Sequence, residues 1–388
     1  MKKLFLMIAV LFAGLTVFTA CGDDNKNGGF DGDAKTLDYN SSNAQAWGNY
    51  MRVVANLLKE DATTLYNEWN TSYNESGKGY ADVFKEHNGT AGFNSALNCV
   101  EQIIDGCTDI AGEVGSAKIG DPYHEYLKGN KEDALFMVES WYSWHSIEDY
   151  SNNIRSIRNA YFGSRDGRVA EASISAVVAS VNEELDNQAK ELIQGAIDAI
   201  ENIPAPFRNN IDADEVAAAM DACADLEDFL DNTLKPFIHE NSEINTDEVL
   251  DPVVKNYVDV VVLPTYKELQ EANTQLNNAV IAFQTNPSDA AFQRCADAWF
   301  TARTPWESSE AFLFGPVADK GLDPNMDSWP LDQAGIVQIM KSKDWAALVW
   351  TGEYDEESET IEQVQALRGF HTLEYLIFKD GKARKVNN

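Results

Sequence analysis

Apolar residues recur every three or four positions along nearly the whole chain, which is the spacing of one face of an α-helix. No segment alternates apolar and polar residues for long enough to predict a β-strand. We therefore expect an all-α protein of antiparallel helical bundles. The pattern predicts helices over residues 44–73, 92–111, 131–161, 173–202, 214–237, 252–284, 288–303, 332–345 and 360–378.

Prolines and small polar residues separate these segments. Ser288 follows Pro287 at the start of one of them and is placed to cap its first turn. The polar, acidic stretch 240–246 lies between two sets of segments. The sequence therefore predicts two bundles, an N-terminal one over residues 37–245 and a C-terminal one over residues 246–388.

The first residues have the order of a bacterial lipoprotein signal. Two lysines precede an apolar run over residues 4–18, and small residues stand before Cys21. We predict a signal peptide over residues 1–20, acylation of Cys21, and a flexible Gly/Asn/Asp-rich tether over residues 21–36. The protein is then expected in the cell envelope, anchored by lipid to the outer membrane and facing the periplasm or the cell surface. An ordinary signal peptide or a short anchor helix is the alternative.

Acidic residues outnumber basic ones, with 63 Asp and Glu against 30 Lys and Arg and a formal net charge of −33. This balance argues against nucleic acid as a partner and favours solubility and the attraction of cations. Apart from Cys21, the cysteines form no C-x-x-C pair and are expected to be buried free thiols. A monomer on a lipid tether is the simplest expectation.

The sequence G-x-H-x-x-E at residues 369–374 is the main candidate for chemistry. His371 and Glu374 are three residues apart, so a helix places both on one face, where they form half of a metal site or an acid/base couple. The alternative is a buried histidine paired with the glutamate of its own helix. His145 and Glu148 repeat the spacing in the first half, where packing among aromatic residues is the competing interpretation.

A second group of candidates lies between two helices that a bundle would bring together. The segment around Arg303 and Glu310 combines aromatic residues with a basic and an acidic side chain, and a loop rich in Trp, Pro and Asp follows it. We expect these side chains to face His371. A structural ion pair between Arg303 and Glu310, and helix capping by Asp327 and Asp332, are the alternatives.

These residues resemble the imelysin-like family over most of residues 250–378. The matching positions are Ala302-Arg303, Pro305-Trp306, 309–312, Phe314-Gly315, 329–332 and 369–378. The first half matches more loosely the segments that follow this region in most members, at Glu139-Ser140, Ser143, 159–163 and 203–207. The chain is therefore similar to a circularly permuted member of the family, a change that is tolerated where the original termini lie close together.

The resemblance implies two four-helix bundles in a circularly permuted imelysin-like topology, with a site at their interface that serves iron uptake. The expected ligand is a metal ion or metal complex, with iron preferred over zinc, and an iron-uptake transporter is the expected partner. The residues expected to hold the metal are His371, Glu374 and Glu310. The residues expected to contact the remainder of the ligand are Arg303, Ser309, Trp306, Asp327, Trp329, His145 and Ser143.

Two other functions stay open at this point. The family takes its name from a peptidase, and a bound cation that activates water, with Glu374 or Glu310 as base, would make a metallohydrolase. The chain has no H-E-x-x-H, S-x-x-K or G-x-S-x-G motif, so we assign no catalytic residue and expect no peptidase activity. A lipoprotein that binds a metal-free organic ligand, or acts as a scaffold, is the third hypothesis.

Overall fold

The structure, a computed structural model, describes residues 29–386. The predicted signal peptide, Cys21 and the first part of the predicted tether lie outside this range. Within it the chain is helical almost throughout, and the two strands, β1 (Phe378–Lys379) and β2 (Lys382–Ala383), form one short antiparallel hairpin. The all-α prediction is confirmed. None of the helices between residues 29 and 386 has the length and apolar character needed to cross a bilayer.

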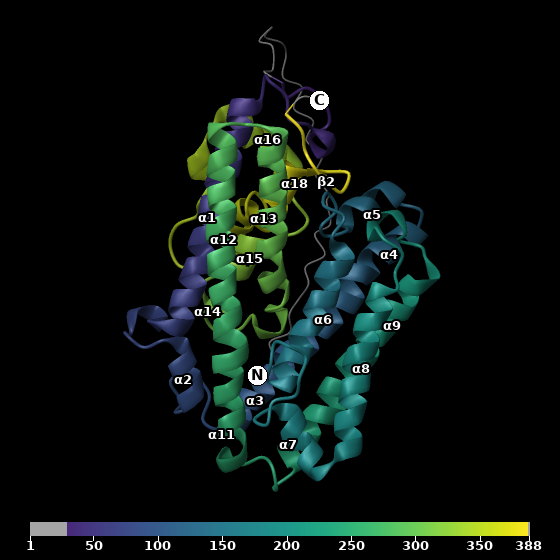
Figure 1. The fold of residues 1–388 in the computed structure, drawn as a ribbon, viewed down its shortest axis with the longest axis vertical. Helices are drawn as coiled ribbons and strands as arrows, with labels where there is room; N and C mark the ends of the chain where they lie inside the picture. Colours follow the sequence, from purple (N-terminus) through teal and green to yellow (C-terminus); the bar gives the residue numbers. More distant parts are fainter. Residues whose placement is uncertain (1–28, 387–388) are drawn as a thin grey trace.

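One bundle contains the first long helix and three helices from the last third of the chain (Figure 1). The apolar residues of its first helix recur at helical spacing, from Trp47 through Val54 and Leu58 to Trp69, and all four are fully buried or nearly so. This stripe packs against the neighbouring helices and forms the bundle core. The bundle consists of α1 (Ala44–Asn70), α12 (Leu263–Thr285), α13 (Asp289–Glu307) and α18 (Gly369–Ile377).

The other bundle lies beside it and is made of helices from the first part of the chain (Figure 1). Ser95 caps the first of these helices by accepting a hydrogen bond from the backbone of Asn98 at 3.2 Å. Each of its helices packs against two others, as in a closed four-helix arrangement. The bundle consists of α3 (Ala96–Glu113), α6 (Ser146–Phe162), α8 (Glu183–Glu201) and α9 (Asp214–Phe229).

Shorter elements connect and extend the two bundles. The α-helices among them are α2 (Tyr80–Glu86), α4 (Asp121–Leu127), α5 (Lys131–Met137), α7 (Ile174–Val181), α10 (Lys235–Glu240), α11 (Asp247–Asn256), α14 (Pro316–Asp319), α15 (Leu322–Asp327), α16 (Gln333–Ser342) and α17 (Glu359–Gln365). The π-helical segments are η3 (Val114–Gly120), η5 (Leu230–Leu234) and η6 (Tyr257–Val262). The 3₁₀ turns are η1 (Ala34–Thr36), η2 (Tyr73–Glu75), η4 (Phe207–Asn209), η7 (Glu310–Phe312) and η8 (Trp345–Leu348).

Helix α1 comes early in the sequence but packs with helices from the last third of the chain. It precedes the boundary predicted at residue 245, yet it packs with helices that follow that boundary. The indole of Trp47 donates a hydrogen bond to the Leu376 carbonyl at 2.9 Å, and the Tyr50 hydroxyl donates one to the Leu367 carbonyl at 2.8 Å. The two packing groups are therefore not the two halves of the sequence, and the circular permutation stays a prediction.

Three of the predicted helices are interrupted, and the one predicted over residues 173–202 is broken at Asn182, between α7 and α8. The helix predicted over residues 131–161 ends at Met137, and the next one begins at Ser146, so the prediction is wrong for residues 138–145. Ser140 and Trp144 in this segment have positive φ angles of 54° and 64°, which a helix does not allow. The helix predicted over residues 360–378 is likewise broken between α17 and α18. The interruptions at residues 138–145 and between α17 and α18 position residues of the candidate site.

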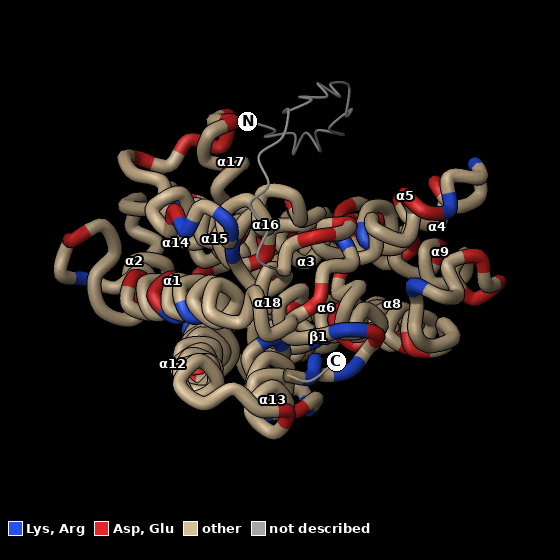
Figure 2. The backbone as a smooth tube through the Cα atoms, turned by 90° about the horizontal axis from the view of Figure 1, so that it is seen from above, with Lys and Arg blue, Asp and Glu red and all other residues tan. Residues whose placement is uncertain are grey.

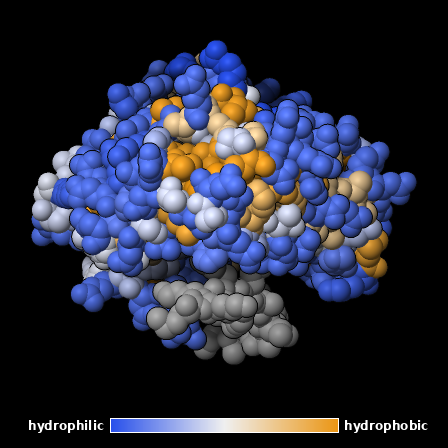
Figure 3. All heavy atoms as spheres, turned by 90° about the horizontal axis from the view of Figure 1, so that it is seen from below, coloured by the Kyte–Doolittle hydropathy of each residue, from blue (hydrophilic) through white to orange (hydrophobic). Residues whose placement is uncertain are grey.

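The surface is mostly hydrophilic. Figure 2 shows acidic positions spread over both bundles, as the net charge of the sequence requires. Seen from below, Figure 3 shows an area of hydrophobic surface enclosed by hydrophilic side chains. The cysteines at positions 99, 107, 223 and 295 are buried and free, which confirms the prediction for them.

Candidate functional site

A buried arginine organises the candidate site. Arg303 on α13 has no exposed surface, and its guanidinium lies 2.7 Å from Glu139 Oε1, 2.6 Å from Glu307 Oε1 and 3.4 Å from Asp149 Oδ2. It also pairs with Asp327. Burial would lower the pKa of Arg303, but these carboxylates raise it well above its ordinary value. Because Arg303 belongs to one bundle and Asp149 to the other, this ionic cluster connects the two.

His371 lies in the same cluster. Its Nε2 is 3.1 Å from Glu139 Oε1, 3.1 Å from Asp327 Oδ1 and 3.3 Å from Arg303 Nη2. Its Nδ1 is 3.1 Å from Glu374 Oε2. Burial and Arg303 lower the pKa of His371, but Asp327 and Glu139 outweigh them and hold it well above the ordinary value. The imidazole therefore carries a proton that a metal ion would have to replace.

Glu374 fixes both the histidine and the segment 138–145. Its Oε1 accepts hydrogen bonds from the backbone N–H groups of Tyr142 at 2.8 Å and Ser143 at 2.7 Å, and from the Ser143 hydroxyl at 2.8 Å. Its other oxygen lies against His371 Nδ1. Glu374 thus orients the imidazole from the side opposite the other carboxylates, as the partner of a metal-binding histidine does.

Burial and charge divide the carboxylates into two classes. Burial would raise the pKa of Glu139, but Lys118, the hydrogen bond with His371 and Arg303 hold it at about 2. The pKa of Asp327 is lowered as well, because Arg303 and His371 outweigh its burial. Burial raises the pKa of Asp149, Glu307 and Glu310 above the ordinary values. The cluster therefore holds more carboxylates than its cationic side chains neutralise.

Lys118 is a further cation in the cluster. It lies in the π-helical segment η3, and its Nζ is 3.2 Å from Glu139 Oε2 and 3.9 Å from Glu113 Oε1. Its side chain is 9% exposed. Burial would lower its pKa, but Glu139 and Glu310 raise it well above the ordinary value. A π-helical segment at this position agrees with the frequent occurrence of such segments at functional sites.

Gly369 determines where α18 begins. Its φ of +89° is unfavourable for any other residue, and a Cβ here would lie 2.4 Å from the carbonyl oxygen of Met326. Only glycine therefore allows α18 to start against the end of α15. This close contact places His371 beside Asp327, the last residue of α15.

The other predicted site residues lie at different distances from the cluster. The Trp306 indole donates a hydrogen bond to Asp327 Oδ2 at 2.6 Å, and the ring of Trp329 lies edge-on to His371 with centroids 4.9 Å apart. The Ser309 hydroxyl instead donates to the Trp306 carbonyl at 2.6 Å, a contact within its own turn. Asp332 caps α16, as one interpretation of the sequence held.

His145 lies at the edge of the cluster. Its Nδ1 is 3.5 Å from Glu148 and its Nε2 is 3.8 Å from Asp149, while its ring packs on Phe300 with centroids 4.6 Å apart. It helps to line a surface depression of about 390 Å³ together with Trp144. The first H-x-x-E pair therefore borders the site without contacting His371.

Four residues of the cluster were missed by sequence reasoning, namely Lys118, Asp149, Glu307 and the carboxylate of Glu139. Glu307 is four residues after Arg303 and Asp149 is four after His145, so helical spacing alone was a usable signal for both. The position of Lys118 depends on a π-helical segment, and that of Glu139 depends on a helix interruption. The periodicity of apolar residues reveals neither feature.

Within residues 29–386, two groups of three side chains have the geometry to hold a metal ion. One consists of Glu139, Asp327 and His371, and the other of Glu307, Glu310 and Asp327. The potential ligand atoms of each group lie within 4.8 Å of one another. Glu374, predicted as a ligand, belongs to neither group because its oxygens contact Nδ1 and the segment 138–145. Carboxylate oxygens with one imidazole suit iron, manganese or zinc better than a soft metal.

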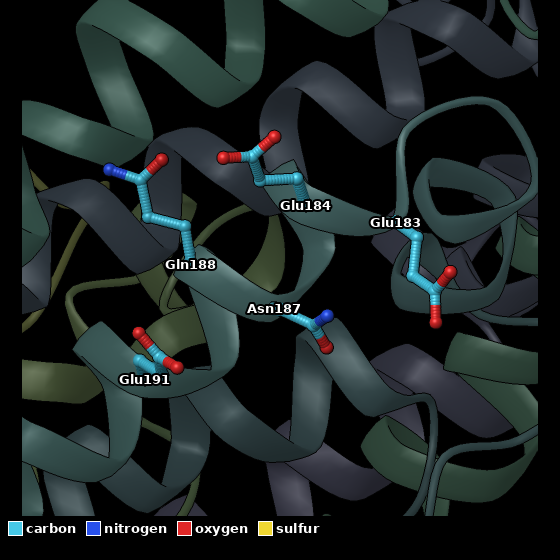
Figure 4. A pocket seen from close by; sticks show the side chains of 5 residues that line it. All are labelled: Glu183, Glu184, Asn187, Gln188 and Glu191. Carbon is cyan, nitrogen blue, oxygen red and sulfur yellow. The ribbon is translucent and has the colours of Figure 1, made fainter.

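A larger depression on the surface differs from this site. It has a volume of about 550 Å³ and lies along α8, where the side chains in Figure 4 project outward. Its lining residues are all exposed and mostly acidic, and none belongs to the buried cluster. They are Glu183, Glu184, Asn187, Gln188 and Glu191.

Comparisons with known proteins agree with the fold. Iron-regulated protein A of Synechococcus elongatus is 34% identical over 130 residues, which make up 34% of this chain and 32% of that protein, so the match spans about a third of this curated relative. The crystal structure of an imelysin peptidase from Bacteroides ovatus is 58% identical, with a TM-score of 0.89 over 91% of this chain and 100% of that chain. The family model described as Imelysin matches residues 22–232 and 262–388. The chain therefore belongs to the imelysin family.

Proposed function

We propose that this protein binds an iron ion, or a small iron complex, as its cargo at the group formed by Glu139, Asp327 and His371. The observation that carries the proposal is the position of His371 Nε2, which lies 3.1 Å from an oxygen of each of these two carboxylates in a fully buried cluster. This set has one histidine and two carboxylates, where the facial triad of non-haem iron oxygenases has two histidines and one carboxylate, but its imidazole and oxygen donors suit iron.

The relatives support a role connected with iron. One of them is named an iron-regulated protein, although the match covers only about a third of its length. We further propose that Cys21 carries a lipid anchor in the cell envelope, where the bound metal would pass to an iron-uptake transporter. The excess of acidic residues, whose positions Figure 2 marks along the backbone, would raise the local concentration of cations around such an anchored protein.

The burial of the site favours an ion over a peptide substrate. Relatives carry the name peptidase, but the side chains of Arg303, Glu307, His371 and Glu374 have no exposed surface. A peptide bond would reach these groups only if the two bundles separated. A metal ion needs a much smaller opening, so binding of an ion agrees better with this arrangement.

Metal titration of the full-length chain tests the proposal. We expect calorimetry with anaerobic Fe²⁺, and in parallel with Fe³⁺ and Zn²⁺, to show binding that weakens by at least about 100-fold in His371→Ala, since a ligand is lost. His239→Ala is the matched control, because His239 is 63% exposed and pairs with Glu101 away from the site. Equal affinity of wild type and His371→Ala, or no binding of any ion by the wild type, would contradict the proposal.

Metal binding is also expected to depend on pH. The raised pKa of His371 means that an ion must displace its proton, so the affinity should increase by about tenfold per pH unit from about pH 6 to 8. Titrations in two buffers that differ in ionisation enthalpy would show the release of at least one proton for each ion bound. An affinity that does not change with pH would mean that His371 is not a ligand.

A further inference from the structure

We propose that Glu307, Glu310 and Asp327 form a second cation position beside the first, and that the two positions share Asp327. The inference rests on the proposed function, because Asp327 belongs to both groups. The second position would take a divalent cation that prefers oxygen ligands, such as Fe²⁺ or Mn²⁺.

Glu310 is the residue that points to a missing cation. It is 6% exposed, and its carboxylate has no hydrogen bond or ion pair within residues 29–386. It lies in the turn η7 just after α13, and this turn places its oxygen within 4.8 Å of ligand oxygens of Glu307 and Asp327. A buried carboxylate is normally paired or hydrogen-bonded, so a carboxylate without either is placed to receive a bound cation.

The cationic side chains nearby are directed at other carboxylates. Arg303 contacts Glu307 and Asp327 but is not within ion-pair distance of Glu310. The ammonium of Lys118 contacts Glu139 at 3.2 Å and acts on Glu310 only over a longer distance. Glu310 therefore has no cationic side chain in direct contact within the described part of the chain.

The shared aspartate sets the relation between the two positions. Asp327 ends α15, its side chain is 4% exposed, and it belongs to both groups of potential ligands. A carboxylate that contacts two cations holds them about 3.5–4 Å apart in two-metal sites. Two ions here would therefore lie close enough to interact magnetically as well as electrostatically.

Mn²⁺ is a suitable probe, because it takes oxygen ligands and has an electron paramagnetic resonance signal. We expect the full-length wild type to bind two Mn²⁺ ions, and Glu310→Gln to bind one. The matched control is Glu268→Gln, a 54% exposed glutamate that pairs with Arg165, and it should still bind two.

Each alternative outcome overturns a defined part of the argument. One ion in the wild type that is retained in Glu310→Gln removes the second position and leaves the proposed function standing. If the wild type binds one ion and Glu310→Gln binds none, Glu310 is a ligand of a single site, and the second position is again removed. No Mn²⁺ ion in the wild type removes the second position, while the iron titration alone decides the proposed function. If the variant does not fold, the wild type alone decides, since two ions sharing Asp327 give a coupled signal and two distant ions do not.

Discussion

Replacement of Arg303 by methionine is expected to lower the free energy of unfolding by about 3–5 kcal/mol at neutral pH. Methionine keeps much of the volume but removes the charge that faces Glu139, Asp149, Glu307 and Asp327. These carboxylates would stay buried without their main counterion, and a buried charge that has lost its partner is strongly destabilising. Urea unfolding followed by circular dichroism measures the change.

The loss should become smaller as the pH is lowered towards about 5. Without Arg303, the folded protein holds the carboxylates at a higher pKa than the unfolded chain does, so proton uptake favours the folded state as the pH falls. Arg168→Met provides the control, because Arg168 is 86% exposed and its ion pair with Asp166 is open to solvent. The control should leave the unfolding midpoint unchanged. A midpoint of Arg303→Met equal to that of the wild type would refute this account of the cluster.

Substitution of Gly369 by alanine is expected to cost about 2–5 kcal/mol, from the left-handed backbone conformation and the added contact together. The new Cβ would lie 2.4 Å from the Met326 carbonyl oxygen, which belongs to the backbone and has little freedom to move aside. We further expect metal binding to weaken, because α18 must shift away from α15 and carry His371 away from Asp327. Unfolding in urea and metal titration of the same sample test both effects.

Gly195→Ala is the matched control for that substitution. Gly195 lies in the interior of α8, and a Cβ there would have no atom within 4 Å. Alanine should stabilise this helix by about 0.5–1 kcal/mol, since glycine is the poorer helix former. If both alanine variants changed stability by the same amount, the close contact at Gly369 would have no special role.

The helical fold was predictable because packing in bundles imposes a regular spacing on apolar residues. The stripe from Trp47 to Trp69 in α1 shows this spacing plainly, and the cap at Ser288 is present as predicted, its hydroxyl accepting a hydrogen bond from the Ala291 backbone N–H at 3.2 Å. The partners of α1 were not predictable from this pattern. A helix stripe records that a face is buried and does not record which helices cover it.

The candidate site was predictable only where its residues lie in regular helices. His371 and Glu374 are one helical turn apart, so their contact follows from the spacing. Glu139 is different, because the apolar pattern continues through residues 138–145 while the backbone leaves the helix there. Its position depends on hydrogen bonds from this segment to Glu374, which is more than two hundred residues away in the sequence.

The hydrogen bonds from the backbone of residues 142 and 143 to Glu374 have a consequence for how the proposed ion would be released. The same short segment contains Glu139, which would contact the proposed ion, and donates backbone N–H groups to Glu374. Displacement of this peptide by a docking partner would withdraw a ligand and free the carboxylate that orients His371 in one movement. A docking partner that displaces the segment 138–145 would therefore release the proposed ion without contacting it and without separating the bundles.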